Sequence, residues 1–113
     1  MKIQSYKFGK LKIDGLMYES DLILTAEEIH ENWQRQSSHR LQMADLDPLL
    51  ALNPTRLIIG TGFMGLLQVD EEVFKALRQH DIKFHVMKTK RALRTFRSYK
   101  NKENVVVALH LTC

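Results

Sequence analysis

The chain has 113 residues, enough for one compact domain and too few for two domains of ordinary size. Hydrophobic residues make up 44% of it and charged residues 27%, a balance typical of a folded protein rather than a disordered polyelectrolyte. The single cysteine, Cys113, excludes a disulfide scaffold and indicates a reducing compartment. No apolar run reaches the roughly 20 residues of a membrane span and no signal core opens the chain, so we expect a cytoplasmic domain over residues 1–113.

The first 24 residues predict short antiparallel strands. Runs of β-compatible residues cover 3–8, 11–13, 16–18 and 22–24, and Asp14-Gly15 is typical of a tight hairpin turn. Thr25 and Glu28 then have the spacing of a capping box, which predicts a short helix over 26–33. The polar residues from 34 to 44 have no periodicity and are expected to form a loop.

Helices and strands alternate in the rest of the chain. Helices are expected from Asp47 to Asn53, from Asp70 to about His80 and from Thr89 to Tyr99. Strands are expected at 57–59, 82–87 and 105–111. Strand-helix-strand order requires crossover connections, so this alternation predicts an α/β layered domain with helices on both faces of a sheet.

Charge is distributed unevenly along the sequence. Residues 1–74 contain 7 Lys and Arg and 11 Asp and Glu, a net charge of −4. Residues 75–113 contain 10 Lys and Arg and 2 Asp and Glu, a net charge of +8, and the two parts sum to +4. On a helix, Lys90, Arg94 and Arg97 would share one stripe, opposite an apolar side. The stripe either binds an acidic protein surface or is a solvated face neutralised by the acidic N-terminal part. Nucleic acid fits less well, because the aromatic residues needed for base stacking would be buried.

The segment Gly60-Thr61-Gly62-Phe63-Met64-Gly65 follows a strand and has the G-x-G-x-x-G spacing of dinucleotide sites. The next helix begins too late for such a site, and Asp70 opens it with carboxylates where phosphate should bind. The glycines therefore serve a turn that needs their backbone angles, or the loop binds a smaller anion. For the second alternative the candidate ligand-binding residues are Gly60, Thr61, Gly62, Gly65, Lys88, Thr89 and Arg91, which would lie along one sheet edge.

The other polar residues form no recognised catalytic or metal motif. The five histidines lack ligand spacing, and Ser37, Ser38 and His39 lack the context of a nucleophile. We therefore expect no catalytic residue, metal or cofactor. Trp33 and Arg35 are candidates for an exposed recognition patch, with a core Trp covered by an Arg side chain as the alternative.

Several segments together resemble one protein family. They are Phe8-Gly9, Ile13-Asp14-Gly15 with Tyr18 and Asp21, Trp33-Gln34-Arg35 with His39, Leu57-Ile58-Ile59-Gly60-Thr61-Gly62, Thr89 with Ala92, and Ala108-Leu109-His110-Leu111-Thr112-Cys113. Over nearly its whole length the chain is similar to the domain-of-unknown-function family that includes the adipogenesis-associated Mth-domain-containing protein and the mitochondrial complex I assembly factor 3. The resemblance implies a three-layer α/β domain around a mixed sheet and no established enzyme activity. It also implies, for one eukaryotic relative, a scaffolding role in respiratory-complex assembly.

Two departures accompany this resemblance. Many relatives have an extended segment before the Trp, in conflict with the helix predicted over 26–33, and they tend to have Tyr-Asn where this chain has Phe96-Arg97. We expect a non-enzymatic protein-interaction or complex-assembly factor with an acidic partner. Its candidate partner-binding residues are Lys90, Arg94, Arg97, Trp33 and Arg35. A small anionic ligand or nucleotide at the Gly60–Gly65 loop is the alternative.

Overall fold

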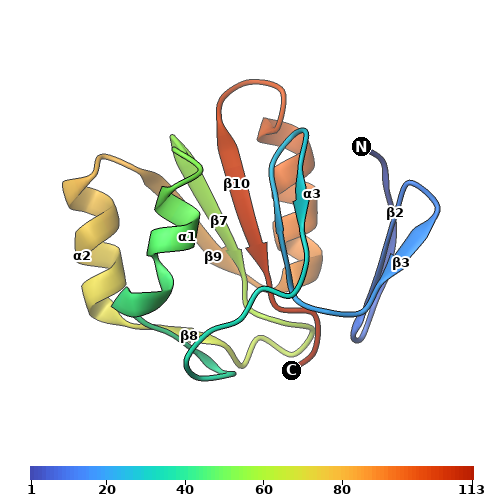
Figure 1. The fold of residues 1–113 in the computed structure, drawn as a ribbon, viewed down its shortest axis with the longest axis horizontal. Coiled ribbons are helices and arrows are strands. Elements are labelled where there is room, and N and C mark those ends of the chain that lie inside the picture. Colours follow the sequence, from blue (N-terminus) through green and yellow to red (C-terminus); the bar gives the residue numbers. More distant parts are fainter.

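A computed structural model describes residues 1–113 and has a five-stranded mixed β-sheet at its centre (Figure 1). The strands follow the order β5-β4-β10-β7-β9, with bounds β4 Leu22–Leu24, β5 Ile29–His30, β7 Arg56–Gly60, β9 Lys83–Met87 and β10 Val105–Leu109. β10 and β9 run parallel to β7, whereas β4 is antiparallel to β10 and β5 is antiparallel to β4. The predicted α/β fold with a mixed sheet is confirmed.

Helices cover both faces of this sheet. α1 (Asp47–Leu50) and α2 (Glu71–Gln79) lie on one face, and α3 (Thr89–Tyr99) lies on the other (Figure 1). Side chains alternate along β10, so Val106 packs in the core under α1 and α2 while Val107 packs in the core under α3. Burying one such side chain contributes about 1.5–3 kcal/mol, and the two apolar faces together hold the three layers. No helix has the length and apolar character needed to cross a membrane.

The N-terminal strands form a separate antiparallel sheet in the order β1-β2-β3, with β1 Ile3–Lys7, β2 Lys10–Ile13 and β3 Leu16–Tyr18. This sheet shares a hydrophobic core with α3, in which Ile3, Leu11 and Ile13 pack with Phe96. The predicted turn at Asp14-Gly15 joins β2 to β3. β1 pairs only with β2 and is therefore an edge strand.

The helix predicted over 26–33 is wrong. Residues 29–30 form β5, which pairs with β4, and the chain then runs without regular structure to Trp33. Thr25 Oγ1 does accept the backbone N–H of Glu28 at 3.0 Å, as in a capping box, but the contact closes a turn between two strands. Pairing with β4 overrides the local helix signal. The extended segment implied by the family resemblance is what forms.

The loop predicted over 34–44 also contains short regular elements. β6 (Arg40–Leu41) pairs parallel with β8 (Gln68–Val69), and a 3-10 helix, η1, covers Met43–Asp45. Arg40 donates to the Asp70 carboxylate at 2.7 and 3.0 Å, which fastens β6 beside β8. Asp70 is the residue before α2, as predicted, but its carboxylate makes no cap hydrogen bond.

Candidate functional site

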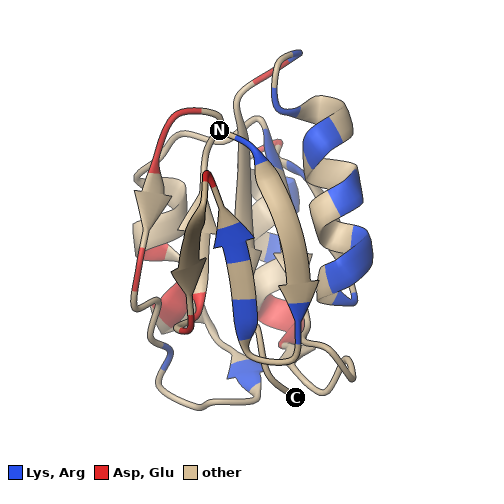
Figure 2. Cartoon of the chain, turned by 90° about the vertical axis from the view of Figure 1, so that its right-hand side faces the viewer, with Lys and Arg blue, Asp and Glu red and all other residues tan.

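Five cations at the start and along the length of α3 form a surface that we call the basic face. It consists of Lys88, Lys90, Arg91, Arg94 and Arg97, and all five residues are exposed. Figure 2 shows the cationic positions of α3 on its outer side, next to β1. None of the five forms an ion pair within 4.0 Å of a carboxylate. The acidic residues of the N-terminal part therefore do not pair with this stripe.

The position of these cations on the helix is electrostatically unfavourable. Lys88 is the N-cap residue of α3, Lys90 and Arg91 follow in its first turn, and no acidic residue accompanies them there. The positive end of the helix dipole disfavours a nearby cation by about 0.3–1 kcal/mol at low salt. α2, by contrast, begins with Glu71 and Glu72. The charges of α2 support its helix, and those at the start of α3 do not.

Two hollows flank the basic face. One, of about 220 Å³, lies between β1 and α3 and is lined by Ile3, Gln4, Ser5, Tyr6, Lys90, Leu93, Arg94 and Arg97. We call it the β1–α3 groove. The other, of about 410 Å³, lies beside β9 and is lined by Val86, Met87, Lys88, Lys90, Arg91 and Arg94. Both hollows place cationic side chains beside apolar ones.

The glycine loop, residues 60–66, binds its own chain through its backbone amides. The N–H of Thr61 donates to Met87 O at 2.8 Å, and those of Phe63 and Leu66 donate to Thr112 O and Cys113 O at 2.7 and 2.9 Å. Gly62 has a φ of +110°, and a Cβ there would lie 2.7 Å from Thr112 O and from Cys113 O. The turn and this close approach explain why position 62 is a glycine. A pyrophosphate could bind these loop amides only if it displaced the C-terminal segment.

The candidate ligand-binding residues divide into two groups. Gly60, Thr61, Gly62 and Thr89 are buried where the loop, α3 and the C-terminal segment meet. The Thr89 hydroxyl donates to His110 O at 2.6 Å and accepts the Gly62 N–H at 2.9 Å, so it is fully engaged inside the fold. Lys88 and Arg91 are exposed, and Gly65 lies against the Lys88 side chain.

An exposed apolar patch, which none of the predicted motifs indicated, adjoins the basic face. This loop patch consists of Phe8, Phe63, Met64 and Leu66, whose exposed fractions range from 49% to 59%. The Phe63 ring lies 5.8 Å from that of Phe8 and 6.0 Å from that of Tyr6. Because Tyr6 also lines the β1–α3 groove, the loop patch and the basic face are continuous. The signal in the sequence was a loop carrying three large apolar residues among its glycines.

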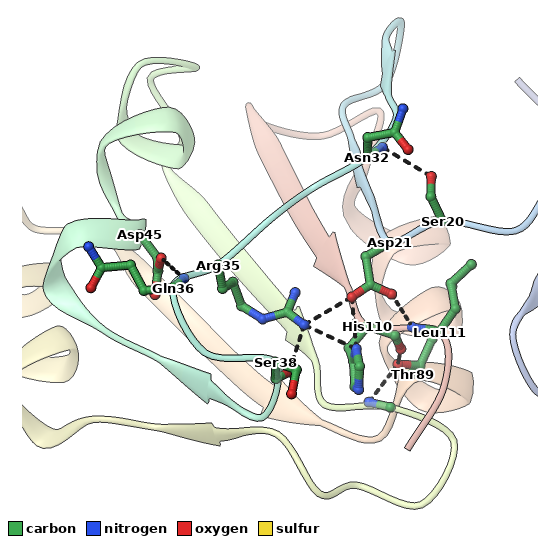
Figure 3. Close-up of polar contacts among 11 residues, drawn as sticks. Ser20, Asp21, Asn32, Arg35, Gln36, Ser38, Asp45, Thr89, His110 and Leu111 are labelled. Atoms are coloured by element: carbon green, nitrogen blue, oxygen red, sulfur yellow. Dashed lines mark hydrogen bonds and ion pairs between the residues drawn. The ribbon is translucent and has the colours of Figure 1, made fainter.

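A second polar cluster lies inside the protein (Figure 3). The Asp21 carboxylate accepts Arg35 Nη2 at 3.0 Å, His110 Nδ1 at 2.8 Å and the Leu111 N–H at 2.8 Å. The side chains of Arg35 and His110 are 4% and 5% exposed. Burial raises the pKa of the Asp21 carboxyl, but the hydrogen bonds from His110, Leu111 and Arg35 and the charge of His110 outweigh burial and hold this pKa below its ordinary value.

Trp33 belongs to this interior cluster. The Arg35 guanidinium lies 4.4 Å from the centre of the Trp33 ring, and Trp33 is 7% exposed. The structure therefore agrees with the alternative in which a core Trp is covered by an Arg side chain. Neither side chain is exposed enough to contribute to a docking surface. No group of three or more His, Cys, Asp or Glu side chains has an arrangement that could hold a metal ion.

Comparisons with known proteins agree with the fold. The protein PH1505 of Pyrococcus horikoshii, described as a conserved hypothetical protein, is 27% identical, with a TM-score of 0.84 and 100% of each chain covered. XCC1710 of Xanthomonas campestris is 23% identical, with a TM-score of 0.81, over 97% of this chain and 83% of that one. A protein of Bordetella pertussis, described as a Mth938-like domain, is 18% identical, with a TM-score of 0.69, over 96% and 84%.

No curated protein matches the chain. A particular relationship to the adipogenesis-associated protein or to the complex I assembly factor stays a prediction. The family described as "Protein of unknown function (DUF498/DUF598)" matches residues 3–110. Because this match spans nearly the whole sequence, the chain belongs to the DUF498/DUF598 family.

Proposed function

We propose that this chain is a non-enzymatic binding protein, a protein-interaction or complex-assembly factor that docks on an acidic surface of a partner protein. The contact is made by the basic face of α3 together with the adjoining loop patch. One observation carries the proposal: five exposed cations have no carboxylate of their own fold within 4.0 Å. Such an unneutralised field attracts a complementary acidic surface and accelerates its encounter.

The composition of the combined surface supports the same function. Interfaces between proteins are enriched in arginine, methionine and aromatic residues, and their binding energy is concentrated in a few such anchors. Arg91, Arg94 and Arg97 supply the arginines, and Phe8 and Phe63 supply exposed rings beside them. The partner surface that fits has acidic residues on one side and an apolar patch beside them.

Affinity capture with two matched variants tests this proposal. The basic-face variant carries Lys90→Glu, Arg94→Glu and Arg97→Glu, and the control variant carries Lys75→Glu, Arg78→Glu and Lys102→Glu at exposed positions elsewhere. The immobilised wild-type protein and the control variant are expected to retain the same partner from a lysate of the source cell. We expect at least a tenfold lower yield on the basic-face variant, measured by quantitative mass spectrometry. Equal recovery on all three proteins would contradict the interface.

The alternative function, binding of a small anion, is favoured by the 410 Å³ hollow beside Lys88 and Arg91. Since the loop amides bind the chain's own carbonyls, the exposed cations of that hollow would hold a phosphate or carboxylate. A ligand that binds only the native state raises its stability. A rise in the Tm of the wild-type protein with millimolar inorganic phosphate, lost on Arg91→Glu, would favour this alternative over protein docking.

A further inference from the structure

We infer that the partner of this protein is bound as an extended acidic segment, which adds a fourth strand to the N-terminal sheet along β1. The inference rests on the proposed function and assigns the β1–α3 groove as the place where the segment lies. Three features of the structure lead to it: a free strand edge, a carbonyl on that edge held by an arginine, and a row of cations along the opposite wall.

The free edge of β1 borders the β1–α3 groove. Its pairing with β2 is regular at Ser5, Tyr6 and Lys7, after an irregularity between Ile3 and Ser5. The two residues Phe8 and Gly9 connect the strands, so the hairpin closes on the pair Lys7 and Lys10. Successive residues of an antiparallel strand alternate between bonding to the neighbouring strand and pointing away from it. Tyr6 therefore directs its N–H and C=O away from β2, and neither group bonds elsewhere in the protein.

The start of the same edge shows what such a group binds when no strand is present. Ile3 O accepts Arg97 Nη2 at 2.8 Å, and Met1 O accepts Lys100 Nζ at 3.0 Å. Side chains of α3 and of the residue after it thus satisfy carbonyls that a neighbouring strand would otherwise satisfy. Covering an edge with cationic side chains is a known protection against unwanted strand pairing. A carboxylate that binds Arg97 would release Ile3 O to accept an amide of an incoming strand.

The opposite wall of the groove determines the charge of the segment. Lys90, Arg94 and Arg97 all line it, together with Leu93. Lys90 and Arg94 are four residues apart, which is about 6 Å along a helix. Every second side chain of an extended strand points to the same side, at a repeat of about 6.6–6.8 Å. A strand with acidic residues at alternate positions therefore presents carboxylates at nearly the repeat of these cations.

Other candidate occupants account for fewer of these features. A bound helix would use the cations but would leave the edge groups of Tyr6 unpaired. A free phosphate would bind one or two cations and no strand edge. Addition of an extended segment to a sheet edge is a common mode of peptide recognition, in which main-chain hydrogen bonds give affinity and alternate side chains give specificity.

The experiment uses a fluorescein-labelled, capped peptide that alternates glutamate and valine over six residues, titrated into the full chain. Two further peptides carry N-methyl groups on alternate residues, one set on the odd and the other on the even positions. All three peptides have the same charge, but each methylated peptide has lost one set of backbone donors. Fluorescence anisotropy gives the Kd of each.

We expect the unmodified peptide to bind and one methylated peptide to bind at least tenfold more weakly, because it has lost the hydrogen bond to Tyr6 O. The other methylated peptide should stay within about threefold of the unmodified one, which is well below the tenfold that 1.4 kcal/mol gives. Hydrogen exchange of the Tyr6 amide, followed by NMR, should slow by tenfold or more in the saturated complex. The control variant should bind the unmodified peptide as the wild type does.

Equal affinity of the two methylated peptides would overturn the strand proposal. An unchanged Tyr6 amide in the saturated complex would do the same, as would failure of the unmodified peptide to bind at about 1 mM. If the peptides bind with equal affinity and the basic-face variant binds none of them, docking on the basic face stands and only the strand geometry falls. If the basic-face variant binds as the wild type does, both the strand proposal and the proposed function fail.

Discussion

Asp21 joins residues that are far from it in the sequence. Arg35 is 14 positions away and His110 is 89 positions away, yet both bond to the same carboxylate oxygen. The other oxygen accepts the N–H of Leu111, just after β10 ends. The C-terminal segment held in this way provides Thr112 O and Cys113 O for the glycine loop. The interior cluster thus supports, through the C-terminal segment, the loop that carries Phe63.

We expect Asp21→Asn to lower the free energy of unfolding at pH 7 by about 3 kcal/mol, because the Arg35 guanidinium would remain buried without its counter-charge. The pKa of Asp21 is depressed in the folded protein, so the contribution of its charge to the free energy of unfolding is complete above the ordinary pKa of 3.8. That contribution is lost as the pH falls through the lower pKa of the folded state. Urea unfolding of both proteins between pH 7 and pH 2.5 measures it.

The difference between wild type and variant should be constant down to about pH 5 and should narrow below about pH 4. Asp47→Asn, at an exposed carboxylate, serves as the control and should change the free energy of unfolding by no more than about 0.5 kcal/mol. If the difference in free energy of unfolding between wild type and Asp21→Asn stays the same down to pH 2.5, the charge of Asp21 does not stabilise the fold.

Residues of this kind lie beyond what the sequence could predict. Trp33 and Arg35 were predicted as candidate site residues because of their residue types alone. No rule of sequence spacing connects them with Asp21 or His110. Their contact depends on β4 lying beside β10, which is a property of the folded sheet. The family resemblance pointed to all four residues without saying that they meet. The turn in the glycine loop could be predicted, because it depends only on local backbone geometry.

α2 and α3 could be predicted almost to the residue, and their shared amphipathic period is the reason. α3 runs from Thr89 to Tyr99 as expected, and α2 begins directly after Asp70. Shorter elements escaped prediction. β6 and β8 have two residues each, too few for a period, and they exist because their strands pair across the chain. The N-terminal strands were predicted because turn residues separate them, whereas the edge position of β1 follows only from the pairing in the folded sheet.

The unfavourable charges at the start of α3 have a measurable effect at the level of this element. Lys90→Glu replaces a cation with an anion at the positive end of the helix dipole. We expect it to raise the free energy of unfolding by about 0.3–1 kcal/mol at low salt. The gain should shrink in 1 M NaCl, where charges are screened beyond about 3 Å. Urea unfolding by circular dichroism measures both values.

Lys75→Glu, in the middle of the exposed side of α2, is the control. It should change the free energy of unfolding by no more than about 0.5 kcal/mol. If Lys90→Glu makes the protein more stable yet weakens partner binding, the cation at position 90 serves binding at the expense of helix stability. If Lys90→Glu instead destabilises the protein at low salt, Lys90 has a structural role in α3 and the argument from the helix dipole fails.

The whole molecule is more polarised than its net charge of +4 suggests. Of the 17 lysine and arginine residues, five form the basic face, and the residues of α3 include no acid to offset them. In Figure 2 the cationic positions follow the outer side of the helix from one end to the other. Charges that lie within about 10 Å of one another act together at 0.1 M salt, whereas more distant ones are screened. A negatively charged surface should therefore bind the protein according to the local charge of the basic face rather than according to the net charge of the whole chain.

Cation-exchange chromatography at pH 7 separates these two possibilities. The basic-face variant and the control variant each exchange three cations for three anions, so the net charge of both falls from +4 to −2. If the local field governs binding, the control variant should still be retained and the basic-face variant should pass through the column or elute at much lower salt. Circular dichroism should show the same fold for both. Co-elution of the two variants would mean that net charge alone sets retention, and the basic face would then have no special capacity to attract an acidic partner.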